Sequence, residues 1–188
     1  VKRRSGFLVP TIKNTANSNN YLSIPYFSAI SLNKDITFTP RFYTDDKFLL
    51  QSEYRQVNKD SKHISDFSFF SQNSKSSKNH FFYDYQKNLN FSYFEESNLD
   101  IKIEKTSNDT YLKSNKLISS LINDYNILKN NLRLNLYSDD LSIKSEFTIY
   151  ENLDKNSSDR YEFILPRFDI SKKFKNQKSL EGNFTFNS

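Results

Sequence analysis

The sequence contains no cysteine, methionine or tryptophan, and only two glycines among its 188 residues. Without cysteine, this chain has no disulfide, no thiolate metal site and no cysteine nucleophile. Its turns must therefore use asparagine, aspartate, serine and lysine in place of glycine. No apolar run approaches the roughly 18 residues of a membrane-spanning helix, but membrane strands alternate apolar and polar residues and need no such run.

Aromatic residues are abundant, and basic residues exceed acidic ones. The chain has 18 phenylalanines and 12 tyrosines, yet its mean hydropathy is −0.76. A soluble core would use more valine, leucine and alanine, so this combination favours a membrane barrel. The net charge of +5 is compatible with an anionic partner, although solvated turns explain it more simply. Because basic and acidic residues alternate and form no stripe, we expect no nucleic-acid partner.

Several segments show the period of two that is typical of strands. The clearest are residues 35–43, 47–57, 132–137 and 141–150. Less regular strand candidates are residues 64–71, 80–86, 99–105, 117–128 and 160–170. Residues 113–128 come nearest to a helical pattern, but their asparagine and serine content argues against a helix. Successive strands joined by short polar connections predict an all-β antiparallel meander.

Two architectures share this alternation: a soluble β-sandwich or sheet, and part of an up-and-down barrel in an outer membrane. In the first, charges point to water and apolar residues to a core. In the second, apolar residues face lipid and charges line a polar lumen. The aromatic clusters FSFF, HFFYDY and NFSYF match the interfacial girdles of membrane barrels, so they favour part of a large transmembrane β-barrel.

Two prolines interrupt neighbouring strand candidates. Pro25 lies in the stretch IPYFSAI, and Pro40 lies in ITFTPRFYT. Proline has no N–H to donate, so each removes a ladder hydrogen bond with a net loss of about 1 kcal/mol. A strand end or a bulge is the usual explanation for one such proline. Two of them in adjacent strands suggest a second explanation, which is a seam weakened at that place.

An ordered series of motifs resembles the LPS-assembly protein family LptD, also called OstA, of Gram-negative outer membranes. The series runs KRRSGFLVP, IPYFSAI, NKDITFTPRFY and LLQSEYR, with a fifteen-residue step from Pro25 to Pro40. A weaker match follows at IEKTSNDTYL, where Asn108 is inserted before Asp109 of the family's S-D-x-x-Y turn. The first 55 residues carry most of the resemblance, and the remainder is compatible with it.

The resemblance implies a periplasmic β-jellyroll followed by a very large antiparallel barrel. We expect the chain to be an internal fragment, in which residues 1–20 are the linker from a jellyroll outside this sequence. Residues 21–188 would then be about the first nine or ten barrel strands. The resemblance also implies a place in the cell outer membrane of a Gram-negative bacterium, where such a protein inserts lipopolysaccharide (LPS) into the outer leaflet.

Individual residues acquire expected roles from this resemblance. Pro25 and Pro40 would belong to a lateral gate for the lipid part of LPS, while the sugars pass through the lumen. A hinge to the periplasmic domain would comprise Arg3, Arg4, Ser5, Gly6 and Phe7, with a plain polar linker as the alternative. The scarcity of glycine suggests a special backbone angle at Gly6. The side chains expected to face the lumen are Arg41, Glu53, Arg55, Arg133, Lys144 and Glu146.

The implied partners are LPS, membrane lipid, an LptE-type lipoprotein plug inside the barrel, and a periplasmic bridge that delivers the substrate. We expect no catalytic residue, cofactor or metal, because His63 and His80 are the only histidines and no ligand recurs at metal spacing. Two alternatives stay open. One is another outer-membrane or surface β protein with a structural or adhesive role, and the other is a barrel hydrolase with serine-dependent activity.

Overall fold

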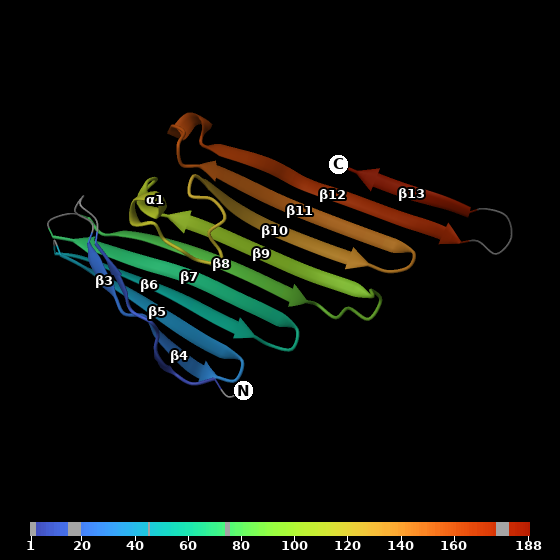
Figure 1. Cartoon of the computed structure of the whole chain (residues 1–188). Helices are drawn as coiled ribbons and strands as arrows, with labels where there is room; N and C mark the ends of the chain where they lie inside the picture. Colours follow the sequence, from blue (N-terminus) through green and yellow to red (C-terminus); the bar gives the residue numbers. More distant parts are fainter. Residues whose placement is uncertain (1–2, 15–19, 45, 74–75, 176–180) are drawn as a thin grey trace.

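The computed structural model describes residues 3–14, 20–44, 46–73, 76–175 and 181–188. Within them, thirteen strands form one antiparallel sheet (Figure 1), which confirms the all-β meander. No helix of the described residues is long and apolar enough to cross a membrane. The strands are β1 (Gly6–Phe7), β2 (Thr11–Lys13), β3 (Tyr21–Ser23), β4 (Tyr26–Ser31), β5 (Lys34–Tyr43), β6 (Lys47–Val57), β7 (Ser61–Gln72), β8 (Lys78–Asn88), β9 (Glu96–Thr106), β10 (Ile127–Tyr137), β11 (Leu141–Asn152), β12 (Tyr161–Lys175) and β13 (Glu181–Asn187).

From β4 to β13, each strand pairs with the next one along the chain, which is the order of a meander. The first edge is more complex, because β3 and β4 both pair with β5. Outside them, β1 pairs with β4 and β2 pairs with β3. Figure 1 shows these N-terminal strands and β13 at opposite edges of the sheet.

The ladders between the long strands are regular. The pairing of β6 with β7, for example, runs from Lys47 opposite Gln72 to Val57 opposite Lys62 without a shift. One register shift lies between β11 and β12, where Glu146 faces Arg167 but Thr148 faces Ile164. Pro166 falls in this irregularity, which is the usual place for a proline inside a sheet.

One face of the sheet is a continuous apolar surface. Cross-strand pairs place Leu50 opposite Phe69, Phe67 opposite Phe81, and Leu132 opposite Phe147. These side chains remain accessible: Phe81 is 45% exposed and Leu132 is 47% exposed. The same face includes Ile36, Phe38, Tyr83, Ile101, Ile103, Ile143, Ile170 and Phe186.

The opposite face carries most of the buried polar groups. They include Asp35, Arg41, Gln51, Asp66, Ser68, His80, Glu104 and Thr148. A soluble sheet would bury its apolar face and expose its charges. This sheet leaves its apolar face accessible and carries its charges on the other face, which is the two-faced character of a membrane-barrel wall. The six charged residues expected to share a face, Arg41, Glu53, Arg55, Arg133, Lys144 and Glu146, all lie on this polar face according to the strand register.

The connection between β9 and β10 departs from the simple meander. This connection, residues 107–126, is called the strap below. It contains the short helix α1 (Tyr111–Asn115), which ends where Lys116 adopts a left-handed backbone conformation with φ of 45°. The prediction of a strand at residues 117–128 was therefore wrong for all but residues 127–128, where β10 begins. The expectation of no helix at residues 113–128 was wrong only for residues 113–115, which belong to α1. The connection between β11 and β12 contains the 3-10 turn η1 (Ser157–Asp159).

The strap is held to the sheet by buried apolar side chains and not by strand pairing. Tyr111, Leu112, Leu117 and Leu121 are at most 6% exposed, and they pack in one apolar cluster on the sheet. The cluster is completed by Leu49, Phe82, Leu128 and Leu153. Each fully buried leucine contributes about 1.5–3 kcal/mol relative to an exposed one. The strap is thus held to the polar face by a small core of its own.

Candidate functional site

Pro25 and Pro40 lie next to one another across two neighbouring strands. Tyr26 pairs with Phe38 and Ser23 pairs with Arg41, so β3 and β4 pair with β5 in the same register before and after Pro25. Ile24 therefore lies opposite Pro40, and Pro25 lies opposite Thr39. Because β3 ends at Ser23 and β4 begins at Tyr26, the ladder is interrupted at this point, which we call the proline gap.

The two prolines remove donors from two different ladders. Pro40 pairs with Leu50 in unbroken register, and without an N–H this must be a pair of the non-hydrogen-bonded kind. The backbone of Pro40 therefore faces the other neighbour, across the gap toward Ile24. The carbonyl of Pro25 accepts a bond from the Leu8 N–H at 2.8 Å. Since both backbone groups of a strand residue point to one side, the nitrogen of Pro25 faces the outer edge.

The N-terminal residues cover this outer edge. Residues 3–13 are called the edge segment below; β1 and β2 belong to it. Phe7 lies opposite Tyr26, and the two rings meet edge to face at 5.1 Å. Thr11 lies opposite Ser23. Of the linker predicted at residues 1–20, residues 1–2 and 15–19 lie outside the described part.

The expected hinge residues are arranged along the first edge. The Arg3 guanidinium lies 2.5 Å from Asp35, whose carboxylate also accepts from Arg55 Nε at 2.8 Å. Ser5 Oγ accepts a bond from the Ala29 N–H at 2.9 Å. Arg4 is exposed. The expected special angle at Gly6 was wrong, because its φ is not positive and it forms part of extended β1.

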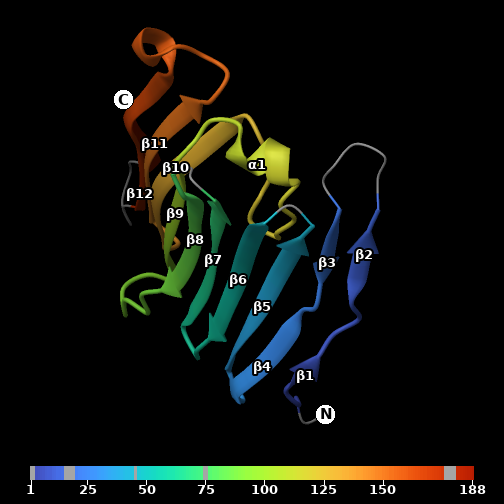
Figure 2. The same cartoon turned by 90° about the vertical axis from the view of Figure 1, so that its left-hand side faces the viewer.

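The strap is bonded to the polar face by side chains of β5, β6 and β7. Arg41 Nη1 donates to the carbonyl of Asn115 at 2.6 Å, and Gln51 Nε2 donates to that of Ile118 at 3.0 Å. Ser68 Oγ lies 2.7 Å from the hydroxyl of Tyr111. Figure 2 shows α1 lying against this side of the sheet. Arg41, one of the residues expected in the lumen, is therefore covered.

A buried polar network lies beneath the strap. Ser68 Oγ is 2.5 Å from His80 Nδ1, and His80 Nε2 is 3.3 Å from Asp66 Oδ1. Serine, histidine and aspartate are the components of a hydrolase triad. However, all three residues are at most 2% exposed, and a nucleophile must meet its substrate in an accessible cleft. We assign this trio to holding the strap through Tyr111.

Ion pairs of Arg160 fix the strap near its start. Arg160 bridges Asp109 of the strap and Glu151 of β11, each at 2.6 Å. The hydrogen bond from Arg160 lowers the pKa of Asp109 below its usual value. Burial raises the pKa of the Tyr111 hydroxyl to about 12. Among the described residues, no group of three or more metal-ligating side chains is placed to hold an ion.

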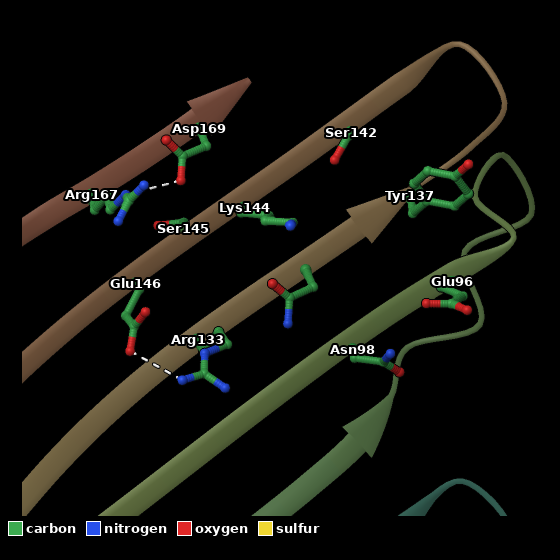
Figure 3. A pocket seen from close by; sticks show the side chains of 11 residues that line it. Glu96, Asn98, Arg133, Tyr137, Ser142, Lys144, Ser145, Glu146, Arg167 and Asp169 are labelled. Atoms are coloured by element: carbon green, nitrogen blue, oxygen red, sulfur yellow. Dashed lines mark hydrogen bonds and ion pairs between the residues drawn. The ribbon is translucent and has the colours of Figure 1, made fainter. Parts of the chain in front are cut away.

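The polar face over β9–β12 is open and forms a groove of about 730 Å³. Two ion pairs lie in it: Arg133 of β10 with Glu146 of β11 at 3.1 Å, and Arg167 with Asp169 along β12 at 3.0 Å. Figure 3 shows Lys144 between them. The lining holds three cations and three carboxylates beside amides and hydroxyls, so it suits a hydroxylated, polar ligand. The groove is lined by Glu96, Asn98, Arg133, Asn135, Tyr137, Ser142, Lys144, Ser145, Glu146, Arg167 and Asp169.

Sequence reasoning found three of the eleven residues that line this groove. Arg133, Lys144 and Glu146 follow from regular alternation, but Arg167 and Asp169 were missed. The irregularity at Pro166 shifts the register just before them, so alternation along residues 160–170 does not show their face. Asn98 becomes a groove residue only because β9 pairs with β10, where it lies opposite Asn135.

These features define a class of protein: an antiparallel meander with the apolar and polar faces of a transmembrane β-barrel wall. Comparison with known proteins is more specific. Parts of the chain are similar to curated proteins named LPS-assembly protein LptD. That of Cupriavidus necator is 30% identical over 109 residues, which is 58% of this chain and 13% of that protein. That of Nitrosococcus oceani is 40% identical over 57 residues, 30% of this chain and 8% of that protein.

A third relative, the LPS-assembly protein LptD of Yersinia enterocolitica, is 41% identical over 56 residues, 30% of this chain and 7% of that protein. No protein-family model matches the chain. The matched stretches span between 7% and 13% of the length of these curated relatives. The chain is thus LptD-like over part of its length, which confirms in part the resemblance seen in its motifs.

Proposed function

We propose that this chain is part of an outer-membrane barrel that inserts LPS into the outer leaflet, and that it acts as a translocon without catalytic activity. The observation that carries the proposal is the occurrence of LptD-like sequence on a sheet with an accessible apolar face and a polar inner face. Residues 1–20 would be the linker from a periplasmic domain, and residues 21–188 would be barrel strands.

The proline gap is the proposed lateral gate. Pro25 and Pro40 each remove one backbone donor, and they do so on opposite sides of the strand at residues 21–31. A missing bond costs about 1 kcal/mol in water-exposed structure and more in lipid, where no water substitutes. The lipid part of LPS would leave through this weakened seam.

The polar face would be the path of the sugars. The groove over β9–β12 presents cations and carboxylates in equal number beside amides and hydroxyls, which fits the hydroxyl groups of saccharides. Glu53 and Arg55 lie further along the same face, and Arg41 supports the strap. We propose an LptE-type lipoprotein plug and a periplasmic LPS-transport bridge as partners, and a place in the outer membrane of a Gram-negative bacterium.

The test uses the full-length parent protein in its own membrane. Pro25→Ala and Pro40→Ala together restore two donors, which should shift the opening equilibrium by about 2 kcal/mol, or roughly 30-fold. We expect LPS at the cell surface to fall several-fold while the barrel assembles normally. Pro166→Ala is the matched control, because this proline sits in a register irregularity far from the gate.

Normal LPS delivery by the double variant would contradict a proline-weakened gate. Normal delivery by cells that lack the parent protein altogether would contradict the transport function itself, and would favour a structural or adhesive barrel. A loss of delivery in Pro166→Ala as well would show that any strand proline is needed for assembly, and the gate would have no support.

A further inference from the structure

The edge segment occupies a position that barrel closure also requires. β1 pairs with β4 and β2 pairs with β3, so the outer edge of residues 21–31 already has a partner. In a closed barrel, the free edge of the first strand pairs with the last strand. One strand edge cannot bond to two partners at the same place. The two arrangements therefore exclude each other.

We propose that the edge segment is an exchangeable strand that covers the free edge of β3 and β4 when the seam is open and leaves when the closing strand pairs there. This inference rests on the proposed function, because it requires a barrel with its seam at this edge. Beyond the proposed function, the inference names the edge segment as the element that would stabilise the open state, and it names the contacts that would hold this segment in place.

The edge segment matches both faces of the sheet, as a strand does and a plain linker does not. Phe7 lies beside Tyr26 of the apolar face, and Ile12 lies beside Leu22, which itself faces Phe42. The side chains of Phe7 and Ile12 are 76% and 79% exposed. Thr11 lies beside Ser23 on the polar face. The segment thus extends the apolar surface and the polar surface by one further strand.

The pairing of the edge segment is short and interrupted. β1 contributes two paired positions and β2 contributes three, whereas β6 and β7 pair along their whole length. Leu8 donates to Pro25, but Pro25 has no N–H to return. Pro10, between β1 and β2, has no donor either. A strand held by so few bonds is suited to being displaced by a longer one.

Charge fixes the start of the edge segment. Asp35 is 1% exposed and pairs with both Arg3 and Arg55. The Arg3 side chain is 55% exposed, so it is able to return to water. Asp35 then still keeps Arg55 as a partner, and no buried charge is left alone. Arg3 is therefore the releasable half of this contact.

The experiment is a disulfide lock in the full-length parent protein in cells. Phe7→Cys and Tyr26→Cys are chosen because the Leu8–Pro25 hydrogen bond makes them the closer, non-hydrogen-bonded kind of pair, within disulfide reach. Trypsin cleaves between them after Lys13, so linked peptides report the bond by mass spectrometry. The control, Ile36→Cys with Tyr54→Cys, is a pair of the same kind between β5 and β6.

We expect both disulfides to form. The edge lock should abolish LPS delivery to the surface until a reductant is added, whereas the control lock should leave delivery unchanged. A further substitution, Arg3→Gln, should lower the yield of the edge disulfide and leave the control yield as it is. Absence of the edge disulfide beside a well-formed control would overturn the pairing.

Normal delivery by the locked protein would overturn the exchange and leave the proposed function standing. The opposite result is also possible: the edge disulfide forms and its yield falls with Arg3→Gln, but the parent protein delivers no LPS even when it is reduced. It would support the edge strand and its charge contact while contradicting LPS transport.

Discussion

Two prolines in one sheet illustrate how much depends on the position of a single residue. Pro166 lies in a register irregularity of β12, where the ladder is already broken. Pro40 lies inside the ten-residue strand β5, paired with Leu50 in unbroken register. Because the backbone of Pro40 faces the gap, the ladder to β6 loses nothing and the ladder to the first strand loses one bond. The weakness is therefore directed to one side.

Tyr111 gives a prediction at the residue scale. Burial raises its pKa to about 12 in the folded state, against about 10 in an unfolded chain. Its contribution to strap stability is complete below pH 10 and is lost as the pH rises toward 12, because the detached tyrosine ionises first. We expect cleavage within the strap by an alkaline-active protease to increase at least tenfold, as an order of magnitude, between pH 9 and pH 11.

The matched variant is Tyr111→Phe, which keeps the ring but has no hydroxyl to ionise. Its strap should be cleaved faster than the wild type at pH 9, because the bond to Ser68 is lost. It should show a smaller increase between pH 9 and pH 11. An equal increase in both proteins would mean that other groups control the alkaline release.

At the scale of elements, the strap is the part that sequence reasoning missed. Its leucines follow neither a strand nor a helical period, because their spacing is set by the sheet beneath them. Leu117 packs with Leu49 and Phe82 of β6 and β8, which are distant in sequence. Local pattern cannot report such a contact, whereas alternation correctly predicted strands such as residues 35–43 and 141–150, whose period is a local property.

Leu117 and Ile118 allow a test of the strap as an element. Leu117 is fully buried and its neighbour Ile118 is 80% exposed. Leu117→Ala should destabilise the strap by about 2–4 kcal/mol, through lost burial and a residual cavity. Trypsin cleavage after Lys113 and Lys116 of the full-length protein should then be accelerated at least tenfold, as an order of magnitude. Ile118→Ala should leave the cleavage rate unchanged.

The cleavage pattern of Leu117→Ala also shows whether the strap and the sheet unfold together. If Leu117→Ala accelerates cleavage only in the strap, the two separate as distinct units. Equal acceleration throughout the chain would mean that they form one cooperative unit. Unchanged cleavage in Leu117→Ala would contradict the packing of the strap.

At the scale of the whole molecule, the two faces were readable from sequence and the site was not. Alternation assigns Glu53, Arg55 and Lys144 to one face of each strand. Which strands lie side by side, and hence which residues share a groove, depends on register and on the turns between them. The edge segment was expected as a linker for the same reason, since its pairing with residues 21–31 appears only when the sheet is assembled.

The nature of the apolar face leads to the most decisive prediction at this scale. Leu132 lies near the middle of β10 on that face and is 47% exposed. In a soluble sheet, Leu132→Arg at an exposed position should change stability by less than about 0.5 kcal/mol. If the face meets lipid, the same change near the bilayer midplane should cost about 2–4 kcal/mol.

The control for Leu132→Arg is Asn135→Arg, three residues along the same strand and on the polar face. Both variants are made in the full-length parent protein, and unfolding by urea is followed after reconstitution in lipid bilayers. We expect Leu132→Arg to lose at least about 2 kcal/mol and Asn135→Arg to stay close to the wild type, because an arginine there remains in a polar lumen. Equal and small effects would place the apolar face in water, and the barrel interpretation would fail together with the gate that depends on it.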